Sequence, residues 1–442
     1  MGEDLADRRA GELAARLQRG ELTAVALATA CLARIAAREP AIEAWAYLDR
    51  ERVLADAAVL DAKRVSGVPL GPLHGLPVGV KDIFDTFDMP TENGTPAHRG
   101  RRPTADATMV SRLRAAGALI MGKTVTSELA VYTAGPTRNP HDPDRTPGGS
   151  SSGSAAAVAA GMVPLALATQ TNGSTIRPAS YCGVVGYKPS LGVLPRTGIL
   201  KQSMLLDQPG LMALDLAGVA LLADALAGQD PADEMSLPAP DSLAAAVADP
   251  LPAPRLAFVR GPYWHLADET ARTALERYVA SLGNRVETVE LGPEFDAAAD
   301  LHRAIMTAGI AEAFAPIYAS AKDVLSPVVT GIIEDGRKLA ATEFIAALSA
   351  RDRLRAVFAE RFAPFDAIVT AATLGVAPKR GGGTGNPIMA TSWTLVGAPA
   401  LTLPLLAGDA GMPLGVQLVG NLRDDVRLLR AAAALERGTH TN

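Results

Sequence analysis

The reactive side chains of this 442-residue chain gather in a stretch of small residues around two loops, 147–154 and 169–178. Serine hydroxyls are the reactive groups there, and a hydroxyl becomes a nucleophile only when a base takes its proton. The stretch contains no histidine that could serve as that base. The candidate hydroxyls belong to Ser150, Ser151, Ser152, Ser154 and Ser174.

A base is available upstream in Lys81, which ends an apolar run at 76–80 that is typical of a buried strand. Burial removes the water that stabilises an ammonium group, so it lowers the pKa of a lysine. A lysine that is neutral near working pH can act as a general base. These residues therefore predict nucleophilic catalysis by a serine with a lysine as base.

The elements that position these groups follow from local composition. The alanine-rich segment 155–160 favours a helix, and 163–168 predicts a short buried strand with an irregular start at Pro164. The first loop therefore opens a helix, whose unpaired N–H groups favour negative charge. The second loop follows a strand, and its small residues allow a close approach to the backbone.

Two segments, GGSSSGSAAAVAAG at 148–161 and TQTNGSTIRPASYCGVVGYKPS at 169–190, resemble the amidase signature family of Ser–cisSer–Lys hydrolases. The VKD segment at 80–82 fits the same pattern. So do the spacings, because Lys81 precedes Ser150 by 69 residues and Ser150 precedes Ser174 by 24. The resemblance runs from about residue 10 to residue 437, and 386–405 and 412–420 resemble the family's closing strands.

Carried over position by position, the resemblance implies that Ser174 is the nucleophile, Ser150 the bridging serine and Lys81 the base. It places the oxyanion hole at the backbone N–H groups of Thr171, Asn172, Gly173 and Ser174. Three further residues are expected to contact the substrate, namely Gly149, Gln170 and Trp393.

The chain departs from the family at two positions, since the family often has Asp where Gln170 stands and Gly where Asn172 stands. Gln170 removes a negative charge near the site. Asn172 adds a side chain to the oxyanion segment, and asparagine tolerates left-handed backbone better than most residues.

The fold implied by the resemblance is an α/β fold in one domain over residues 1–442, with a large mixed sheet covered by helices on both faces. The core motif region would be 74–190. Helical residues at 297–362 are expected to form the variable wall of the pocket, although the same spacing is that of a core stripe. The candidates are Met306, Ile310, Phe314 and Ile317. The strand–helix–strand pattern at 255–291 predicts parallel pairing.

Three other local motifs compete with this interpretation. Residues 117–124 match the P-loop pattern, which requires a strand, a flexible loop and then a helix, whereas here a helix precedes and the four intervening residues are strand-like. Residues 149–153 fit the nucleophile elbow, which would make Ser151 the nucleophile of a Ser-His-Asp esterase. Its histidine would be His265, His302 or His440. Residues 148–154 could also be a flexible linker, but apolar elements on both sides favour an ordered loop.

The composition and charge of the chain limit the kinds of molecule that it is expected to bind. A net charge of −5 and a pI near 5.8 argue against a nucleic-acid-binding surface. The N-terminus has no apolar signal core, and the longest apolar run is too short to span a membrane. Cys31 and Cys182 are expected to be buried, and no metal-ligand spacing appears. We therefore expect a cytoplasmic monomer or homodimer with no metal, cofactor, nucleic-acid or membrane partner.

The predicted activity is hydrolysis of a C–N bond of a small amide through an acyl-enzyme on Ser174. Amides, esters and carbamates present the same carbonyl, and the pocket walls select among them, so aryl amides and carbamates (urethanes) remain a hypothesis. An alternative is the amidase subunit of a tRNA-dependent amidotransferase, which Gln170 and the short C-terminal end disfavour. The other alternative is the esterase that uses Ser151.

Overall fold

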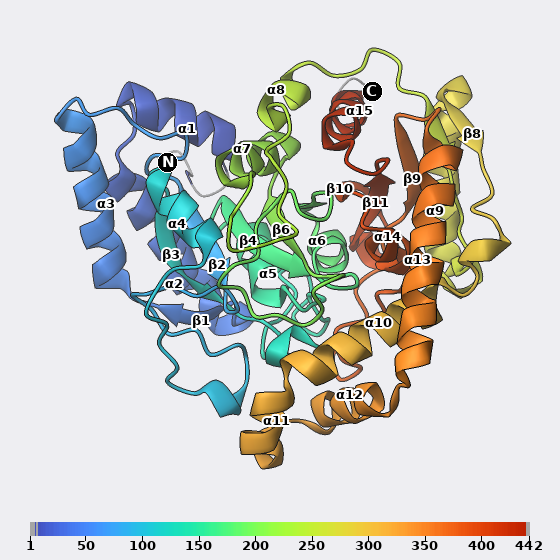
Figure 1. The fold of residues 1–442 in the computed structure, drawn as a ribbon. Coiled ribbons are helices and arrows are strands. Elements are labelled where there is room, and N and C mark those ends of the chain that lie inside the picture. The colour runs from blue at the N-terminus through green and yellow to red at the C-terminus, as the bar shows by residue number, and fades with distance from the viewer. Residues whose placement is uncertain (1–4, 6–7, 439–442) are drawn as a thin grey trace.

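The computed structural model describes residues 5 and 8–438. Within them, eleven strands form one mixed sheet across the centre of Figure 1. From one edge to the other, the strands are β1 (Trp45–Leu48), β3 (Leu119–Thr124), β2 (Pro77–Lys81), β4 (Leu165–Gln170), β6 (Gln208–Ala213), β5 (Val185–Lys188), β10 (Ala400–Ala407), β11 (Pro413–Val419), β9 (Ala367–Ala371), β7 (Leu256–Phe258) and β8 (Val286–Thr288).

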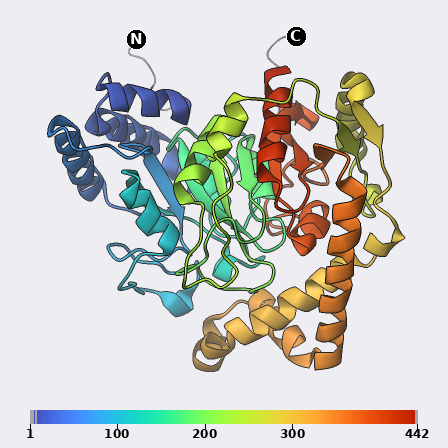
Figure 2. The same ribbon diagram turned by 45° about the horizontal axis from the view of Figure 1, so that its top comes forward.

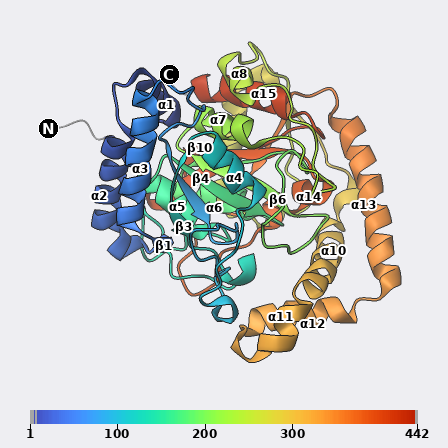
Figure 3. The ribbon, with the colours of Figure 1, turned by 60° about the vertical axis from the view of Figure 1, so that its left-hand side comes forward.

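Helices surround this sheet, as Figure 2 and Figure 3 show from two further directions. In chain order, the α-helices are α1 (Ala10–Arg19), α2 (Ala24–Ile42), α3 (Arg50–Val65), α4 (Thr108–Ala115), α5 (Ser152–Ala159), α6 (Ile176–Cys182), α7 (Leu216–Leu226), α8 (Leu243–Ala248), α9 (Glu269–Ser281), α10 (Ala298–Ala313), α11 (Ala315–Ala321), α12 (Pro327–Lys338), α13 (Ala341–Phe362), α14 (Ile388–Val396) and α15 (Asp425–Gly438).

The central strands are covered on both faces, because every residue of β2, β4 and β6 is buried although successive side chains point to opposite sides. Helices α5 and α7 both pack against β4 and β6, and α15 packs against β9, β10 and β11. The predicted α/β class with a large mixed sheet is confirmed.

The three strands that position the reactive groups run parallel, in the order β3-β2-β4. Gly79 on β2 pairs with Ala166 on β4, so the last residues of both strands reach the same edge of the sheet. Lys81 ends β2, and Thr169 is the last but one residue of β4. The pairing therefore brings Lys81 beside Thr169.

Helix α5 begins within the predicted first loop and packs tightly against the strands. A Cβ on Gly153 would lie 2.3 Å from both the Ala44 carbonyl oxygen and the Val125 nitrogen, so this position accepts only glycine. The helix begins at Ser152, three residues before the alanine run that predicted it, and β4 begins two residues after the predicted strand. The loop is therefore ordered and is not a flexible linker.

In the second half of the chain, the structure confirms the predicted strand–helix–strand unit and corrects the expectation for the segment 386–405. Strands β7 and β8 pair in parallel and flank α9, as the strand–helix–strand pattern predicted. The segment 386–405 is not all strand, because Ile388–Val396 forms helix α14, which ends at Gly397 in the left-handed region. Cys31 and Cys182 are both buried, as expected.

The P-loop interpretation fails on geometry. Strand β3 runs through Gly122, Lys123 and Thr124, so this backbone is committed to the sheet and cannot cradle a phosphate. The Lys123 ammonium is buried, forms an ion pair with Asp82 at 3.2 Å and donates to the Phe84 carbonyl oxygen at 2.9 Å. Lys123 therefore has a structural role.

Helices α10 to α13 lie along the bottom and the right side of Figure 1. Within the described residues, no single helix has the length and apolar composition to cross a membrane. One pair, 293–313 with 315–324, meets both criteria only when its parts are combined across a 57° bend.

Candidate active site

The structure brings Lys81 and Ser150 together inside the protein. The Lys81 Nζ atom lies 2.7 Å from Ser150 Oγ and 2.8 Å from Thr169 Oγ1, and its side chain is fully buried. Burial lowers the pKa of the Lys81 ammonium well below its usual range, and the charge of Asp207 opposes that shift. Lys81 is thus an amine that can be neutral with a hydroxyl at hydrogen-bonding distance.

The loop that carries Ser150 is held from several directions. The Gly149–Ser150 peptide bond is cis. The buried Arg177 guanidinium donates to the Gly149 carbonyl oxygen at 2.5 Å, and the Ser127 N–H donates to the Ser150 carbonyl oxygen at 3.2 Å. A Cβ on Gly149 would lie 2.7 Å from the Thr384 methyl carbon, so glycine fits closely here. Gly149 therefore positions Ser150.

The segment 171–174, which we call the donor segment, has four consecutive backbone N–H groups that donate no hydrogen bond within the described part of the chain. Asn172 and Ser174 are partly exposed, so this row can donate to an acceptor on a molecule that binds from solvent. These are the four residues expected to form the oxyanion hole. The row is suited to binding a negatively charged oxygen.

Ser174 ends this row and is partly exposed. Among residues 5 and 8–438, its hydroxyl has no hydrogen-bond partner. A hydroxyl without a bond to the protein can rotate toward a substrate carbonyl. The structure thus leaves Ser174 accessible, whereas Ser150 is buried.

The Gln170 side chain, expected to contact the substrate, instead braces the donor segment from behind. Its oxygen accepts from the Thr175 and Ile176 N–H groups at 2.9 and 3.0 Å, and its nitrogen donates to Thr394 Oγ1 at 3.0 Å. Gln170 is fully buried. A neutral amide is therefore used here for both its acceptor and its donor.

Four further side chains hold the donor segment, and the sequence did not single them out for this role. His302 Nε2 donates to the Thr171 carbonyl oxygen at 2.8 Å. Burial lowers the pKa of His302 to about 4, so this imidazole is neutral. The other three are Thr391, Thr394 and Asp207.

We expect Gln170→Ala to lower the free energy of unfolding by about 2–4 kcal/mol, because it leaves two buried N–H groups without an acceptor. The kcat should fall more than about 10-fold, since the donor segment loses its support. Urea unfolding and steady-state kinetics measure both effects. Gln170→Glu keeps the acceptor oxygen and should recover much of the stability. An alanine variant as stable as the parent would contradict this role.

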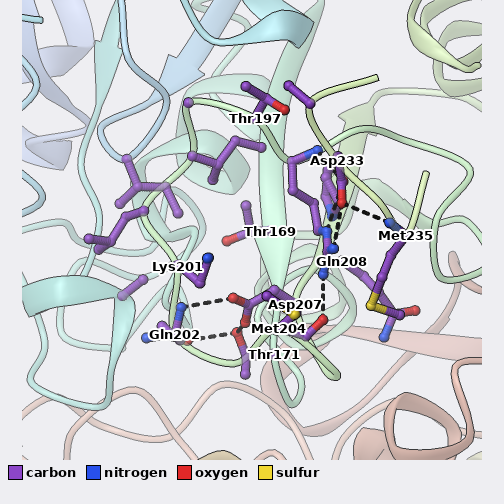
Figure 4. Close-up of a pocket in the computed structure, with 18 of the residues that line it drawn as sticks. Thr169, Thr171, Thr197, Lys201, Gln202, Met204, Asp207, Gln208, Asp233 and Met235 are labelled. Atoms are coloured by element: carbon purple, nitrogen blue, oxygen red, sulfur yellow. Dashed lines mark hydrogen bonds and ion pairs between the residues drawn. The ribbon is translucent and has the colours of Figure 1, made fainter. Parts of the chain in front are cut away.

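A cavity of about 400 Å³ opens beside these residues (Figure 4). Thr169 and Thr171 line it, so it reaches both the lysine site and the start of the donor segment. Asp207 lies in its wall, where Oδ1 is 2.7 Å from Thr171 Oγ1. Residues 196–202, Met204 and 232–235 also line the cavity, and an ion pair of 2.6 Å joins Arg196 to Asp233.

The sequence profile of the family described as Amidase matches residues 26–429. The chain belongs to the amidase family. The predicted resemblance is therefore confirmed over nearly the whole chain. This membership makes the chain an enzyme that acts on carbon–nitrogen bonds.

Proteins of similar sequence and solved structures of similar fold also support membership of the amidase family. A glutamyl-tRNA(Gln) amidotransferase subunit from Chloroflexus aggregans (strain MD-66 / DSM 9485) is 36% identical over 96% of this amidase and 94% of that protein. A structure of native peptide amidase from Stenotrophomonas maltophilia has a TM-score of 0.87 at 31% identity, covering 98% and 97% of the two chains. A structure described as "An unexpected vestigial protein complex reveals the evolutionary origins of an s-triazine catabolic enzyme" has a TM-score of 0.92 at 30% identity, covering 98% of both chains.

Two expected contributors to substrate binding do not line this cavity. Trp393 is 3% exposed and packs against Phe358 with ring centroids 6.1 Å apart, so α14 turns it into the core. The stretch 297–362 does not line the 400 Å³ cavity. Its candidate side chains Met306, Ile310 and Phe314 are buried in an apolar cluster that Ile317 joins at the edge. Their helical spacing is that of a core stripe.

The esterase geometry is missing from the described residues of the amidase. Ser151 is fully buried and its hydroxyl donates to the Thr169 carbonyl oxygen at 3.3 Å. His302 bonds to Thr171, and His265 lies in a short 3₁₀ turn at Trp264–Leu266. His440 lies outside the described residues. No histidine of the described part contacts the Ser151 hydroxyl.

Proposed function

We propose that this amidase, as one domain over residues 1–442, hydrolyses the C–N bond of a small amide through an acyl-enzyme on Ser174. The observation that supports the proposal most strongly is the buried Lys81 amine 2.7 Å from Ser150 Oγ, close in the fold to a row of unpaired N–H groups. A base, a bridging hydroxyl, an accessible hydroxyl and an anion-binding backbone are the four parts that acyl transfer requires.

The proposed reaction begins with Lys81 uncharged. Its amine accepts the proton of Ser150 while Ser150 Oγ accepts the proton of Ser174, and Ser174 Oγ attacks the carbonyl carbon. The donor segment binds the resulting oxyanion. Ser150 then gives a proton to the leaving amine and regains one from Lys81, so the C–N bond breaks and the acyl group stays on Ser174. A water molecule releases the acid by the same steps.

Aryl amides and carbamates are the substrate classes that we propose to test first, and esters would undergo the same chemistry. A 400 Å³ cavity fits a small molecule. Its wall combines apolar side chains such as Ile199, Leu200 and Met204 with the carboxylate of Asp207. Such walls select among compounds that present the same carbonyl.

A second candidate function is that of one component of an amidotransferase. Relatives named as subunits of glutamyl-tRNA(Gln) amidotransferase are 34–36% identical over 94–97% of their own length. By name, these relatives support this candidate more directly than they support the hydrolase. The chemistry at Ser174 would be shared, and the released ammonia would be transferred instead of lost. The expectation of no nucleic-acid partner gains no support from these relatives, because their name includes a tRNA.

The deciding experiment uses the purified chain alone. We expect release of 4-nitroaniline from anilide or carbamate chromogens, and a sulfonyl fluoride adduct on Ser174 detected by mass spectrometry. Hydrolysis of glutamine that requires added amidotransferase partner subunits would favour the second candidate. An adduct on Ser151 would overturn the assignment of the nucleophile.

A further inference from the structure

The side chain of Asn172, in the middle of the donor segment, is held in one orientation by helix α14. Thr391 Oγ1 donates to Asn172 Oδ1 at 2.7 Å, and Thr394 Oγ1 donates to the Asn172 carbonyl oxygen at 2.6 Å. The two threonines are three residues apart and so share one face of the helix. Because its oxygen faces α14, the amide nitrogen of the partly exposed Asn172 is directed away from that helix.

The amide nitrogen meets Tyr132. Asn172 Nδ2 donates to the Tyr132 hydroxyl oxygen at 3.4 Å, and that hydroxyl donates to the Met306 sulfur at 3.9 Å. A thioether is a weak acceptor, so a ligand oxygen can take over the Tyr132 hydrogen at little cost. Tyr132 is also partly exposed.

Tyr132 is tied to the loop of the bridging serine. The Ser127 N–H donates to the Ser150 carbonyl oxygen at 3.2 Å, and the Ser127 hydroxyl donates to the Val131 carbonyl oxygen at 2.5 Å. The position of Tyr132 is therefore linked to that of Ser150, while the position of Asn172 is linked to the donor segment. The hydrogen bond between Asn172 and Tyr132 therefore connects the donor segment with the loop that carries Ser150.

We infer that Asn172 and Tyr132 form a subsite for a hydrogen-bond acceptor atom next to the scissile carbonyl, on the acyl side of the substrate. Both groups offer a hydrogen, one from the second amide N–H of Asn172 and one from the phenol. A carbonyl oxygen bound to the donor segment brings the atoms attached to its carbon close to Asn172. The subsite thus favours carbamates, whose alkoxy oxygen is an acceptor, over alkyl amides. This inference rests on the proposed function.

The test compares two substrates of the same shape. Methyl N-(4-nitrophenyl)carbamate and N-(4-nitrophenyl)propanamide differ by an oxygen in place of a CH₂ group, and both release 4-nitroaniline. Water then releases methyl carbonate or propanoate from Ser174. We expect the ratio of kcat/KM for carbamate over amide to fall about 5-fold in Asn172→Ala and in Tyr132→Phe, the effect of one hydrogen bond.

Comparing ratios cancels the intrinsic difference in reactivity between the two substrates, and it cancels a general structural defect, which lowers both rates together. Tyr318→Phe on helix α11 is the matched control, because the Tyr318 hydroxyl donates to Glu334 and not to the subsite, and its ratio should equal that of the parent. An unchanged ratio in both subsite variants, with the amide still hydrolysed, overturns the inference alone. A parent chain that hydrolyses neither substrate overturns the proposed function together with the inference.

Discussion

Ser174→Ala is expected to reduce kcat by at least about 10⁴-fold, because the other hydroxyl of the donor segment, on Thr171, is hydrogen-bonded to Gln202 and Asp207. The fold should be unaffected. Within the described residues, the Ser174 hydroxyl makes no hydrogen bond, so its removal leaves no buried partner unpaired. Steady-state kinetics with an anilide chromogen and a thermal melt of the same samples measure the two effects.

Ser151→Ala is the matched control for this result. Ser151 is the nucleophile of the elbow alternative, and its hydroxyl bonds to both the N–H and the carbonyl oxygen of Thr169 at 3.3 Å. Its removal should lower stability by about 1–3 kcal/mol and leave kcat within about 10-fold of the parent. Turnover that survives in Ser174→Ala and disappears in Ser151→Ala would reverse the assignment.

The sequence predicted the parts of the fold that depend on local periodicity. The apolar runs that became β2 and β4 were visible, and so was the parallel pairing of β7 with β8. The start of α5 was missed by three residues, since Gly153 and the serines around it are weak helix formers. Close packing of Gly153 against Val125 outweighs that propensity.

The site was predictable to the extent that its residues lie within the two loops. Thr169 and Arg177 belong to the stretch 169–178 that the sequence singled out, although the structure places them in β4 and α6, where they contact Lys81 and Gly149. His302 was not, because it contacts Thr171 across 131 residues and lies in an apolar helix like any core residue. The same spacing led to Met306, Ile310 and Phe314 as candidates for a pocket wall, although helical spacing does not distinguish a pocket wall from a core.

The lysine assignment predicts a specific pH dependence. The active form of Lys81 is the neutral amine, so kcat/KM should rise about 10-fold per pH unit below the folded-state pKa of Lys81 and then level off. Because burial lowers the pKa of Lys81, the plateau should begin well below the ordinary lysine value of 10.5. Lys81→Met should lower kcat by about 10²–10⁴-fold and abolish this rising limb.

Thr169→Val is the matched control. It removes the hydroxyl oxygen that contacts the Lys81 amine, but it keeps the shape of the side chain and leaves Lys81 itself in place. A hydroxyl oxygen at 2.8 Å stabilises the ammonium form, so the variant should lower the pKa of Lys81 further. In this variant, the rise of kcat/KM with pH should therefore occur at lower pH. If kcat/KM still rises over the same pH range as in the parent in both Lys81→Met and Thr169→Val, another group is the base.

The free energy of unfolding also reports on the protonation of Lys81, and this measurement does not depend on turnover. Between the lowered pKa of the folded state and the value of 10.5 in the unfolded state, the unfolded chain binds the extra proton. The free energy of unfolding contributed by Lys81 therefore rises with pH across that window, and it is lost as pH falls from 10.5 to the folded-state pKa. Urea unfolding of the parent minus that of Lys81→Met should show this slope, and other lysines cancel in the difference. A flat difference would mean that Lys81 keeps its charge in the folded protein, which a general base in this position cannot do.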